Sequence, residues 1–485
     1  MTTEDVFLLA ILFVAVAWVV RRRRGFTHLR GVRLASMRRA LALAWHARLR
    51  SPRSVRFGLR LPIESMRGSY LILGASQSGK TVLLNLFRQS LLPLFADPAE
   101  SLLLIDFDPK RDNRFWARSL PPDVPYFDLS PSVYGQGFDL FGDCEHDGDL
   151  VTVADALLPE VKNDHQPHFR NTAVLLLVSV LRAARWHGHR LTLRQVVLIG
   201  GDLKDLRRYL KSCPATAPVV TAHLNDGDEA MSVFATLSSG VNRYRTVAAA
   251  WSHADRSVTV SEFLSLPKAV LNLPYEDDAM PVLAPILRLI LMRLEQKVLK
   301  QNRRGRRVVF LLDEYRILRD IRLYLLACKG AEAGVSLFYA CQSYVGACEA
   351  HGEPIVKELF GLAKNRIFLR LDGYDDALYA SKSLGRAEGY MTLFNKGGWG
   401  ESSHAQDNVE PGTVMNLPLP TSRDLVIRGF GTTPYTRPFR FRFPFRKHLA
   451  FLDDAKSVPP LPSRPAAQFD LLPLAADERR ELGLK

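Results

Sequence analysis

Short apolar runs that end in polar residues recur along the chain, and they predict the strands of a buried sheet. They cover residues 69–73, 101–106, 269–273, 307–315, 336–342 and 365–371. Each run is apolar at most positions, as is typical of strands that are covered on both faces. Helical spacing follows several of them, notably after residue 82 and over residues 281–300. The pattern therefore predicts an α/β fold.

A different pattern occupies residues 147–263. It contains helical stretches at residues 170–186, 192–199, 202–212 and 228–252. Gly and Pro residues separate these stretches, and no strong strand run interrupts them. We interpret this region as an all-helical insertion within the sheet-forming domain.

The N-terminal apolar run, residues 6–20, predicts a membrane anchor over residues 1–24. As a helix the run spans roughly 22 Å, which is short against a hydrocarbon core of about 30 Å. Acidic residues precede it and four arginines follow it, which is the reverse of a cleaved signal peptide. The positive-inside rule then places the body of the protein in the cytoplasm. A buried or partner-binding helix is the alternative.

The next segment, residues 25–65, is strongly basic. Residues 1–60 hold thirteen arginines, no lysine and two acidic residues, and so carry +11 of the net charge of +15. Leu34, Leu41 and Leu43 give the segment a partly amphipathic pattern. We interpret it as a helix on anionic lipid headgroups, with nucleic-acid binding as the alternative. The rest of the chain is close to neutral, so the total charge alone does not indicate DNA binding.

The composition is that of a globular protein with room for two or three domains. Its five cysteines are scattered and lack C-x-x-C spacing. The sequence therefore predicts reduced thiols, and neither a disulfide framework nor a zinc site.

Residues 74–81, Gly-Ala-Ser-Gln-Ser-Gly-Lys-Thr, match the phosphate-binding pattern G-x-x-x-x-G-K-[ST] between a predicted strand and a predicted helix. The glycines let backbone N–H groups turn toward a phosphate at the helix N-terminus. The residues expected to bind the nucleotide are Gly74, Ser76, Ser78, Gly79, Lys80 and Thr81. Lys80 can reach the outer phosphates, and the Thr81 hydroxyl can hold Mg²⁺. ATP and Mg²⁺ are the expected cofactors.

Acidic residues follow two of the predicted strands. Five apolar residues run into Asp313 and Glu314, which is the pattern of a Walker B strand. Its aspartate can hold the Mg²⁺ hydration shell, and its glutamate can polarise the attacking water, so hydrolysis is predicted rather than binding alone. Asp108 and Lys110, after the strand at 101–106, are expected to face the nucleotide or a neighbouring subunit.

Polar residues on two further strands are candidates for contact with the nucleotide. Gln342 is predicted to lie beside the P-loop as a γ-phosphate sensor, because an amide can donate to a phosphate and accept from a water. A glutamine bonded only to backbone is the alternative. Arg366 and Arg370 share one face of their strand. Either can act on the nucleotide of a neighbouring subunit, or both can be ordinary surface or ion-pair residues.

The C-terminal part alternates in character. Residues 395–412 are predicted to form an exposed loop, and aromatic and basic residues interleave over residues 435–446. We interpret that interleaving as an edge strand with aromatic side chains inward, with a base-stacking platform as the alternative. From residue 459 the chain is rich in Pro and Ala, which predicts a flexible tail.

In their order along the chain, these features resemble the type IV coupling proteins of conjugation and type IV secretion (the TraD/TraG group), within the FtsK/HerA class of P-loop ATPases. The features are the anchor, residues 74–81, Asp108-Pro-Lys110, the helical insertion, Leu312-Asp-Glu314, Ala340-Cys-Gln-Ser343 and residues 365–377. The resemblance covers roughly residues 66–440.

The resemblance implies a RecA-like P-loop NTPase domain with an inserted all-α domain, assembled as a homo-hexameric ring with ATP between subunits. Such rings pass DNA, usually a relaxase-bound single strand, toward a secretion channel in the bacterial inner membrane. By motif position, Lys80, Glu314 and Gln342 are expected to be catalytic, and Thr81 and Asp313 to hold Mg²⁺. Expected partners are DNA, type IV secretion components and the membrane.

The expected division of the chain follows from the patterns and the resemblance together. It comprises an anchor at 1–24, a basic juxtamembrane segment at 25–65, a RecA-like ATPase domain at 66–146 and 264–450, the all-α insertion at 147–263 and a flexible tail at 451–485. Family members usually carry two membrane helices, whereas this sequence offers one apolar run.

The principal alternative function is a membrane-tethered, nucleotide-switched scaffold that binds partners and does not translocate DNA. Glu314 and Gln342 favour turnover, because a scaffold would not need both residues. A HerA-like helicase or nuclease partner in DNA repair is a third option, which the anchor disfavours. The lack of a Leu-Ser-Gly-Gly-Gln signature disfavours an ABC transporter ATPase.

Overall fold

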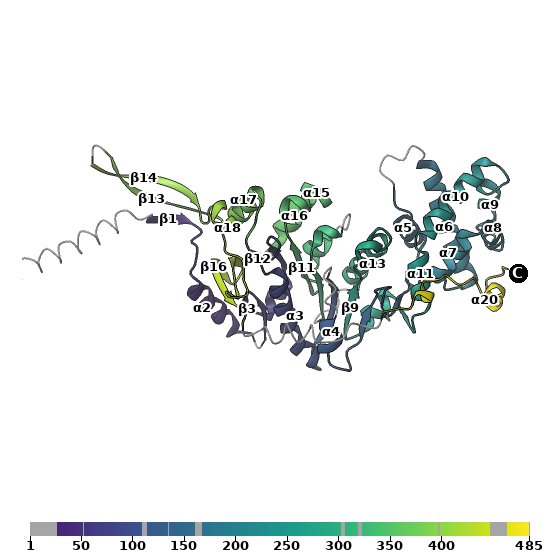
Figure 1. Cartoon of the computed structure of the whole chain (residues 1–485), viewed down its shortest axis with the longest axis horizontal. Helices are drawn as coiled ribbons and strands as arrows, with labels where there is room; N and C mark the ends of the chain where they lie inside the picture. The colour runs from purple at the N-terminus through teal and green to yellow at the C-terminus, as the bar shows by residue number, and fades with distance from the viewer. Residues whose placement is uncertain are drawn as a thin grey trace, which may run out of the picture.

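The architecture is taken from a computed structural model of the whole chain (Figure 1). The structure describes residues 27–51, 53–108, 114–133, 135–160, 167–301, 306–318, 323–395, 398–446 and 463–484. The predicted anchor at 6–20 lies outside these residues. Among the helices that are described, none combines the length and the apolar character needed to cross a bilayer.

A nine-stranded mixed sheet forms the centre of the molecule. Its order is β16 (Thr436–Pro444), β15 (Val426–Thr433), β12 (Ala363–Phe368), β4 (Ser69–Leu73), β11 (Val335–Cys341), β10 (Arg306–Leu312), β5 (Ser101–Phe107), β9 (Lys268–Leu273) and β6 (Tyr126–Asp128). The strands from β12 to β6 are parallel, and β15 and β16 add an antiparallel end. The α/β prediction is confirmed. All six predicted strands are present, with ends that differ by at most three residues.

The central strands are apolar throughout because both faces of the sheet are covered. Every residue of β4 and β11 is buried. On one face, Tyr70, Ile72 and Phe338 pack against α2 (Met37–Arg48), α3 (Lys80–Ala96) and α4 (Arg114–Ser119). Figure 1 shows these helices along the lower side of the sheet.

The opposite face of the sheet carries a second helical layer. It consists of α13 (Met280–Gln301), α14 (Tyr324–Lys329), α15 (Tyr344–His351), α16 (Glu353–Leu362), α17 (Tyr374–Ser383) and α18 (Pro411–Met415). Leu71, Leu73 and Phe310 belong to the core on this side. The period of two along each strand therefore divides its side chains between two cores.

The basic segment at 25–65 folds onto the sheet and does not form a separate unit. It contains β1 (Thr27–Gly31), α2, β2 (Ser54–Phe57) and β3 (Leu59–Pro62). Ala40, Ala44, Phe57 and Leu61 are buried in the same core as α3. The predicted boundary at residue 65 is therefore not a boundary in packing. Small alanines, rather than the leucines of the sequence pattern, make the close contact of α2.

A helical lobe occupies the other end of the molecule (Figure 1). It contains α5 (Asp147–Leu157), α6 (Pro167–His187), α7 (Leu193–Gly201), α8 (Leu203–Lys211), α9 (Ala217–His223), α10 (Asp228–Asn242) and α11 (Arg245–Ser252). The predicted helix at 228–252 is divided near Tyr244. Among the described residues of 147–263, β8 (Ser257–Val258), paired with β7 (Gly137–Phe138), is the one departure from helix and loop, and α12 (Val260–Ser265) leads back to the sheet.

The prediction of a flexible tail is wrong for residues 463–484, which pack on the helical lobe. Leu471, Leu474 and Leu482 are buried in the lobe's core. Arg194 binds Glu478 at 2.6 Å and Asp205 binds Arg479 at 2.6 Å. The segment includes α20 (Ala476–Glu481), which lies beside α8 in Figure 1. The spaced leucines outweigh the Pro- and Ala-rich composition, because the lobe offers them an apolar surface.

Two further C-terminal expectations have opposite outcomes. The predicted loop at 395–412 is wrong: β13 (Arg386–Asn395) and β14 (Gly398–Asp407) form a long hairpin, to which β1 adds a third strand. The edge-strand interpretation of 435–446 is confirmed. In β16, Phe439 and Phe441 are buried while Arg440 and Arg442 are exposed.

Glu295 on α13 provides a test of this packing through pH. Its side chain is buried, and burial raises its pKa from 4.5 to about 7, although a backbone hydrogen bond from Leu326 acts in the opposite direction. The folded state therefore holds a proton that the unfolded state loses, and the free energy of unfolding falls as the pH rises from 4.5 to about 7. Glu295→Gln should raise the melting temperature at pH 8, by the equivalent of about 1–3 kcal/mol. It should change the melting temperature little at pH 4.5. Equal shifts at both pH values would contradict this assignment.

Candidate functional site

The P-loop connects β4 to α3 at the carboxyl edge of the parallel strands. Gly79 has a φ of 103°, and a Cβ there would come within 2.8 Å of Ile427 on β15. At Gly74, a Cβ would meet the Ser78 hydroxyl at 2.6 Å. Close packing therefore requires both fixed glycines of the motif, and at Gly79 the positive φ requires one as well. Gln77 also takes a positive φ, of 60°.

Lys80 begins α3, and its side chain is buried under the loop. Its ammonium donates to the carbonyl of Gly74 at 2.5 Å and to that of Ala75 at 3.3 Å. The Ser78 hydroxyl donates to the same Ala75 carbonyl at 2.7 Å. The loop thus brings a cation to the N-terminus of a seventeen-residue helix, where backbone N–H groups and the helix dipole favour an anion.

Gln342 lies next to the P-loop because β11 pairs directly with β4. The Gly74 amide donates to the Cys341 carbonyl at 3.1 Å, which places the end of β11 against the start of the loop. The Gln342 amide nitrogen donates to Glu314 at 3.0 Å, and its backbone N–H approaches the other carboxylate oxygen at 3.3 Å. Glu314 has a φ of 60°. The structure therefore joins the predicted sensor and the predicted base in one hydrogen-bonded pair.

A second carboxylate holds the N-terminus of α15. Asp376 of α17 accepts hydrogen bonds from the Ser343 hydroxyl and from the backbone N–H groups of Tyr344 and Val345. Ser343 in turn caps α15 by accepting from Gly346 at 2.9 Å. These contacts fix the backbone directly after Gln342 and so restrict the conformations of Gln342 at the site.

A buried charge network lies between α3 and β5. Arg88 donates to both oxygens of Asp106, at 2.9 and 2.8 Å, and lies 3.2 Å from Asp108. The Trp116 indole donates to Asp106 at 2.5 Å. Burial acts to lower the pKa of Arg88, but the two carboxylates outweigh it and raise that pKa overall. Asp108 is therefore turned toward Arg88.

Asp313 is buried directly after β10 and precedes Glu314. Its backbone N–H donates to the Phe107 carbonyl at 2.9 Å, which joins the ends of β10 and β5. Its charge also contributes to the raised pKa of Arg88. The candidate metal ligand thus lies near the P-loop helix and its arginine.

A cavity of about 250 Å³ opens above the P-loop. It is lined by Ala75, Ser76, Gln77, Gly79, Lys80, Thr81, Val82, Gln342, Pro420 and Phe445. Pro420 and Phe445 were missed by sequence reasoning, because they are more than 300 residues away in the chain and carry no nucleotide-binding signature. The alternation of aromatic and basic residues over 435–446 was the one available signal. It identified Phe445 as inward-facing.

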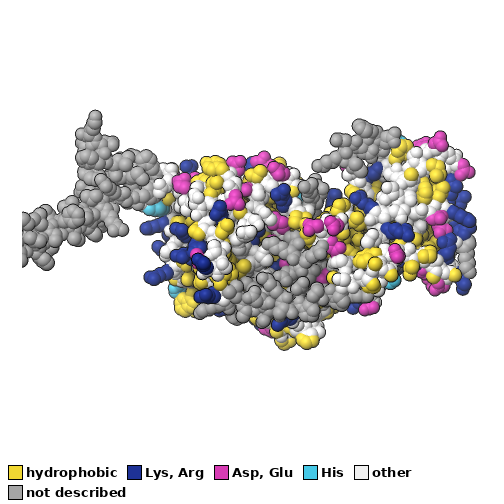
Figure 2. All heavy atoms as spheres, viewed as in Figure 1, with side chains coloured by type: hydrophobic (Ala, Val, Ile, Leu, Met, Phe, Trp, Pro, Cys, Tyr) yellow, Lys and Arg dark blue, Asp and Glu magenta, His cyan; other side chains and the backbone are white. Residues whose placement is uncertain are grey.

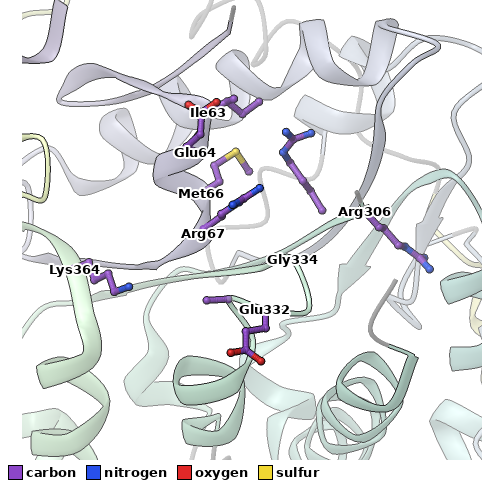
Figure 3. Close-up of a pocket in the computed structure, with 10 residues that line it drawn as sticks. Ile63, Glu64, Met66, Arg67, Arg306, Glu332, Gly334 and Lys364 are labelled. Carbon is purple, nitrogen blue, oxygen red and sulfur yellow. The ribbon is translucent and has the colours of Figure 1, made fainter. Parts of the chain in front are cut away.

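A larger cavity of about 560 Å³ lies at the opposite edge of the sheet (Figure 3). Its charged lining mixes basic and acidic side chains, namely Glu64, Arg67, Arg306, Arg307, Glu332 and Lys364. These residues precede the strands or start them, whereas the P-loop follows a strand. This cavity is therefore separate from the candidate nucleotide site.

Arg366 and Arg370, the two arginines that could act on a neighbouring subunit's nucleotide, have different surroundings. Arg366 donates to the carbonyls of Ala363 and Gly361 at 2.8 Å and closes the junction between α16 and β12. Arg370 forms an ion pair with Asp372 at 3.1 Å and is partly exposed. Lys110 lies outside the described residues.

Comparison with known protein families gives a match that includes the residues of this site after the P-loop. The model of the type IV secretion-system coupling protein DNA-binding domain matches residues 132–410, more than half of the chain. The chain belongs to this family. The matched range of this coupling protein contains the helical lobe, Asp313, Glu314 and Gln342, and the P-loop precedes it. The resemblance found in the sequence is confirmed.

Solved structures of the bacterial conjugative coupling protein TrwB share the fold. An unbound form is similar with a TM-score of 0.68 at 18% identity, over 86% of this chain and 93% of that one. Complexes of TrwB with ADP and Mg²⁺ and with the ATP analogue ADPNP give TM-scores of 0.67 and 0.66, each at 18% identity, over 86% of this chain and 94% of TrwB. The likeness shows a common α/β P-loop fold with a large mixed sheet. No curated protein sequence matches the chain.

The buried arginine of this coupling protein gives a direct test of the site's support. Arg88→Met leaves Asp106 and Asp108 without their cation, and should lower the free energy of unfolding by about 3–5 kcal/mol. Arg53→Met is the matched control, because Arg53 also contacts two carboxylates but its side chain is 32% exposed. Arg53→Met should lower the free energy of unfolding by less than about 1 kcal/mol. Urea denaturation of both variants measures the difference, and equal losses would contradict the assigned role.

Proposed function

We propose that this coupling protein hydrolyses ATP and uses the energy to drive DNA or nucleoprotein toward a type IV secretion channel. The observation that carries the proposal is the Glu314–Gln342 hydrogen bond at the cavity that the P-loop forms. The arrangement sets a carboxylate and an amide beside the place where the outer phosphate of a nucleotide would lie. Membership of the coupling-protein family supports the DNA substrate.

The residues present fit ATP and Mg²⁺. The loop from Gly74 to Thr81 offers backbone donors and the buried ammonium of Lys80 to a triphosphate. Thr81 and Asp313 would hold Mg²⁺, which supplies charge neutralisation at the transferred phosphate. Within the described ranges, no group of three or more His, Cys, Asp or Glu side chains could enclose a metal ion. That finding suits Mg²⁺, because this ion usually takes one or two protein carboxylates and completes its shell with phosphates and water.

Glu314 and Gln342 would act together on the attacking water. The Glu314 carboxylate accepts the water's proton or orients its lone pair toward the phosphate, while Gln342 fixes the carboxylate by donating to it. The Gln342 amide oxygen is free of that hydrogen bond and can accept from the same water. The positive φ of Glu314 aims its side chain at Gln342, so the pair is positioned before a nucleotide arrives.

The remaining parts of the proposal concern assembly and location. We propose a homo-hexameric ring with nucleotide between subunits. Arg370 is the proposed arginine that reaches a neighbour's nucleotide, because Arg366 is bonded to the carbonyls of Ala363 and Gly361 within the fold. The apolar run at residues 6–20 supports a single-pass anchor in the bacterial inner membrane, with the body in the cytoplasm. Relaxase-bound single-stranded DNA and type IV secretion components are the proposed partners, and the helical lobe is the proposed contact for them.

Steady-state ATPase activity of the full chain, with and without single-stranded DNA, tests the motor. Lys80→Ala and Glu314→Gln should each lower kcat by about 100-fold or more and abolish any stimulation by DNA. Glu314→Gln should still bind ATP, because the variant keeps the P-loop. Lys364→Ala and Glu332→Gln are matched controls at the other sheet edge and should leave the rate unchanged.

The outcomes separate the motor from the scaffold. Stimulation by DNA that both site variants lose supports a DNA motor. Slow hydrolysis that ignores DNA would favour a nucleotide-switched scaffold or a factor for protein substrates. A folded oligomer that hydrolyses no ATP would overturn the proposal.

Phe445 tests the base end of the cavity. Phe445→Ala removes an aromatic wall that a nucleobase can stack on, and should raise KM for ATP about tenfold with little change in kcat. Phe443→Ala, two residues earlier and outside the cavity lining, is the control and should leave KM near its native value. A loss confined to kcat would show that Phe445 does not contact the base.

A further inference from the structure

The helix α2 presents a row of apolar side chains that the fold leaves uncovered. Leu41, Trp45 and Leu49 follow one another at intervals of four residues, and their exposed fractions are 47%, 54% and 63%. Such spacing places them along one side of the helix. Ala40 and Ala44, on a different side, are buried at 0% and 2% and belong to the core formed with β3 and β16. The contact between α2 and the sheet therefore leaves Leu41, Trp45 and the C-cap residue Leu49 exposed to solvent.

The segment that contains this row is basic and lacks acidic residues. Arg33, Arg38, Arg39 and Arg50 are exposed and Arg48 is partly exposed. None of these five guanidinium groups makes a hydrogen bond or an ion pair with a residue that the structure describes. The sequence from Val6 to Ile63 contains no Asp or Glu. Figure 2 shows Lys and Arg side chains gathered with hydrophobic ones at the end of the body where Figure 1 places α2.

This combination distinguishes α2 from the other exposed apolar residues of the described chain. Leu29 and Val32, 54% and 42% exposed, precede α2 and extend the same segment. The exposed apolar residues of the helical lobe do not form such a row: Leu175 and Trp186 are eleven residues apart on α6, and Val151 and Met231 are on α5 and α10. A continuous apolar row with arginines on its flanks needs a partner that is apolar inside and negatively charged at its surface.

We propose that α2 lies on an anionic lipid bilayer, with Leu41, Trp45 and Leu49 inserted below the headgroups and the flanking arginines on lipid phosphates. Tryptophan is suited to this depth, since its ring is apolar and its N–H remains near the headgroups. Basic side chains beside an apolar helical face are the pattern of a surface-lying helix. A nucleic-acid backbone would match the arginines but would offer no place for the two leucines.

The position of α2 in the chain supports the same occupant. The apolar run at 6–20 and Arg21–Arg24 precede it by only twelve residues. The inference rests on the membrane location proposed above and adds an orientation to it. Since α2 packs on β16 at one end of the sheet, that end would face the bilayer, and the helical lobe would be the part farthest from it (Figure 1).

The test uses the full chain in vesicles whose acyl chains carry bromine, which quenches tryptophan emission at short range. Vesicles containing phosphatidylglycerol are compared with vesicles of phosphatidylcholine alone. The emission of Trp45 is obtained as the difference between the native protein and Trp45→Phe. We expect at least half of this difference to be quenched in the anionic vesicles and less in the neutral ones. The matched control is Trp186, which is 64% exposed on the lobe. Its emission, obtained as the difference between the native protein and Trp186→Phe, should not be quenched.

Each other outcome overturns the proposal. If the protein binds vesicles while Trp45 stays unquenched, the upstream segment alone holds the membrane. If single-stranded DNA without lipid shifts the Trp45 emission, the occupant is nucleic acid. If the emission shifts with protein concentration without lipid, the occupant is a second copy of the chain. Quenching of Trp45 should be the same in Lys80→Ala, so a failure of ATP hydrolysis leaves this measurement unaffected.

A second pair of variants tests the apolar contact without removing the reporter. Leu41→Ser with Leu49→Ser should reduce Trp45 quenching at least twofold, and these substitutions are at exposed positions where the fold does not need the leucines. Leu472→Ser, at a residue 55% exposed in the C-terminal segment, is the control and should leave quenching unchanged. Equal quenching in all three proteins would show that the row does not enter the bilayer.

Discussion

Parallel pairing of β4, β11, β10 and β5 is the constraint on which the site depends. Parallel strands bring their carboxyl ends to one edge, so the P-loop after β4, Gln342 after β11 and Asp313 after β10 converge there although they are distant in sequence. The register is fixed by apolar side chains on both faces, because a slip of one residue would exchange the two cores. The positions of the polar groups at this edge are thus set by apolar packing in the two cores of the sheet.

Several buried charged groups lie at the edge where the P-loop follows β4, and the fold stabilises them in different ways. Arg88 pairs with both Asp106 and Asp108 in the buried interior, while the Lys80 ammonium donates to loop carbonyls. Charges held in this way need no rearrangement of solvent when an anion arrives, and their interactions are stronger than they would be in water. The same burial makes the network intolerant of losing one partner.

Much of the central sheet and the site could be read from the sequence, because the signals there are local. A strand buried on both faces is apolar along its whole length, and the P-loop motif reports its own strand, turn and helix. Gln342 could be placed from strand order alone. Its bond to Glu314 could not, since that contact depends on the unusual backbone of Glu314.

Apart from the β13–β14 hairpin, whose pairing is local, the features that escaped prediction depend on distant partners. Phe445 reaches the nucleotide cavity only because β15 and β16 extend the sheet beyond β12. In α2, alanines are buried while larger apolar residues are exposed, which reverses the expectation from hydrophobicity. Leu471 and Leu482 lie in a segment whose composition is that of a linker, and only the surface of the helical lobe makes them core residues.

The packing of residues 463–484 on the lobe has a mechanical consequence. The lobe is joined to the sheet by the chain on either side of residues 147–263, and the segment after β16 returns to it a third time. Arg479 pairs with Asp205 of α8 and Leu482 is buried in the lobe's core, so a movement of the lobe must carry this segment along. A fluorophore near residue 482, paired with one near the P-loop, would therefore act as a gauge of lobe displacement during a turnover cycle.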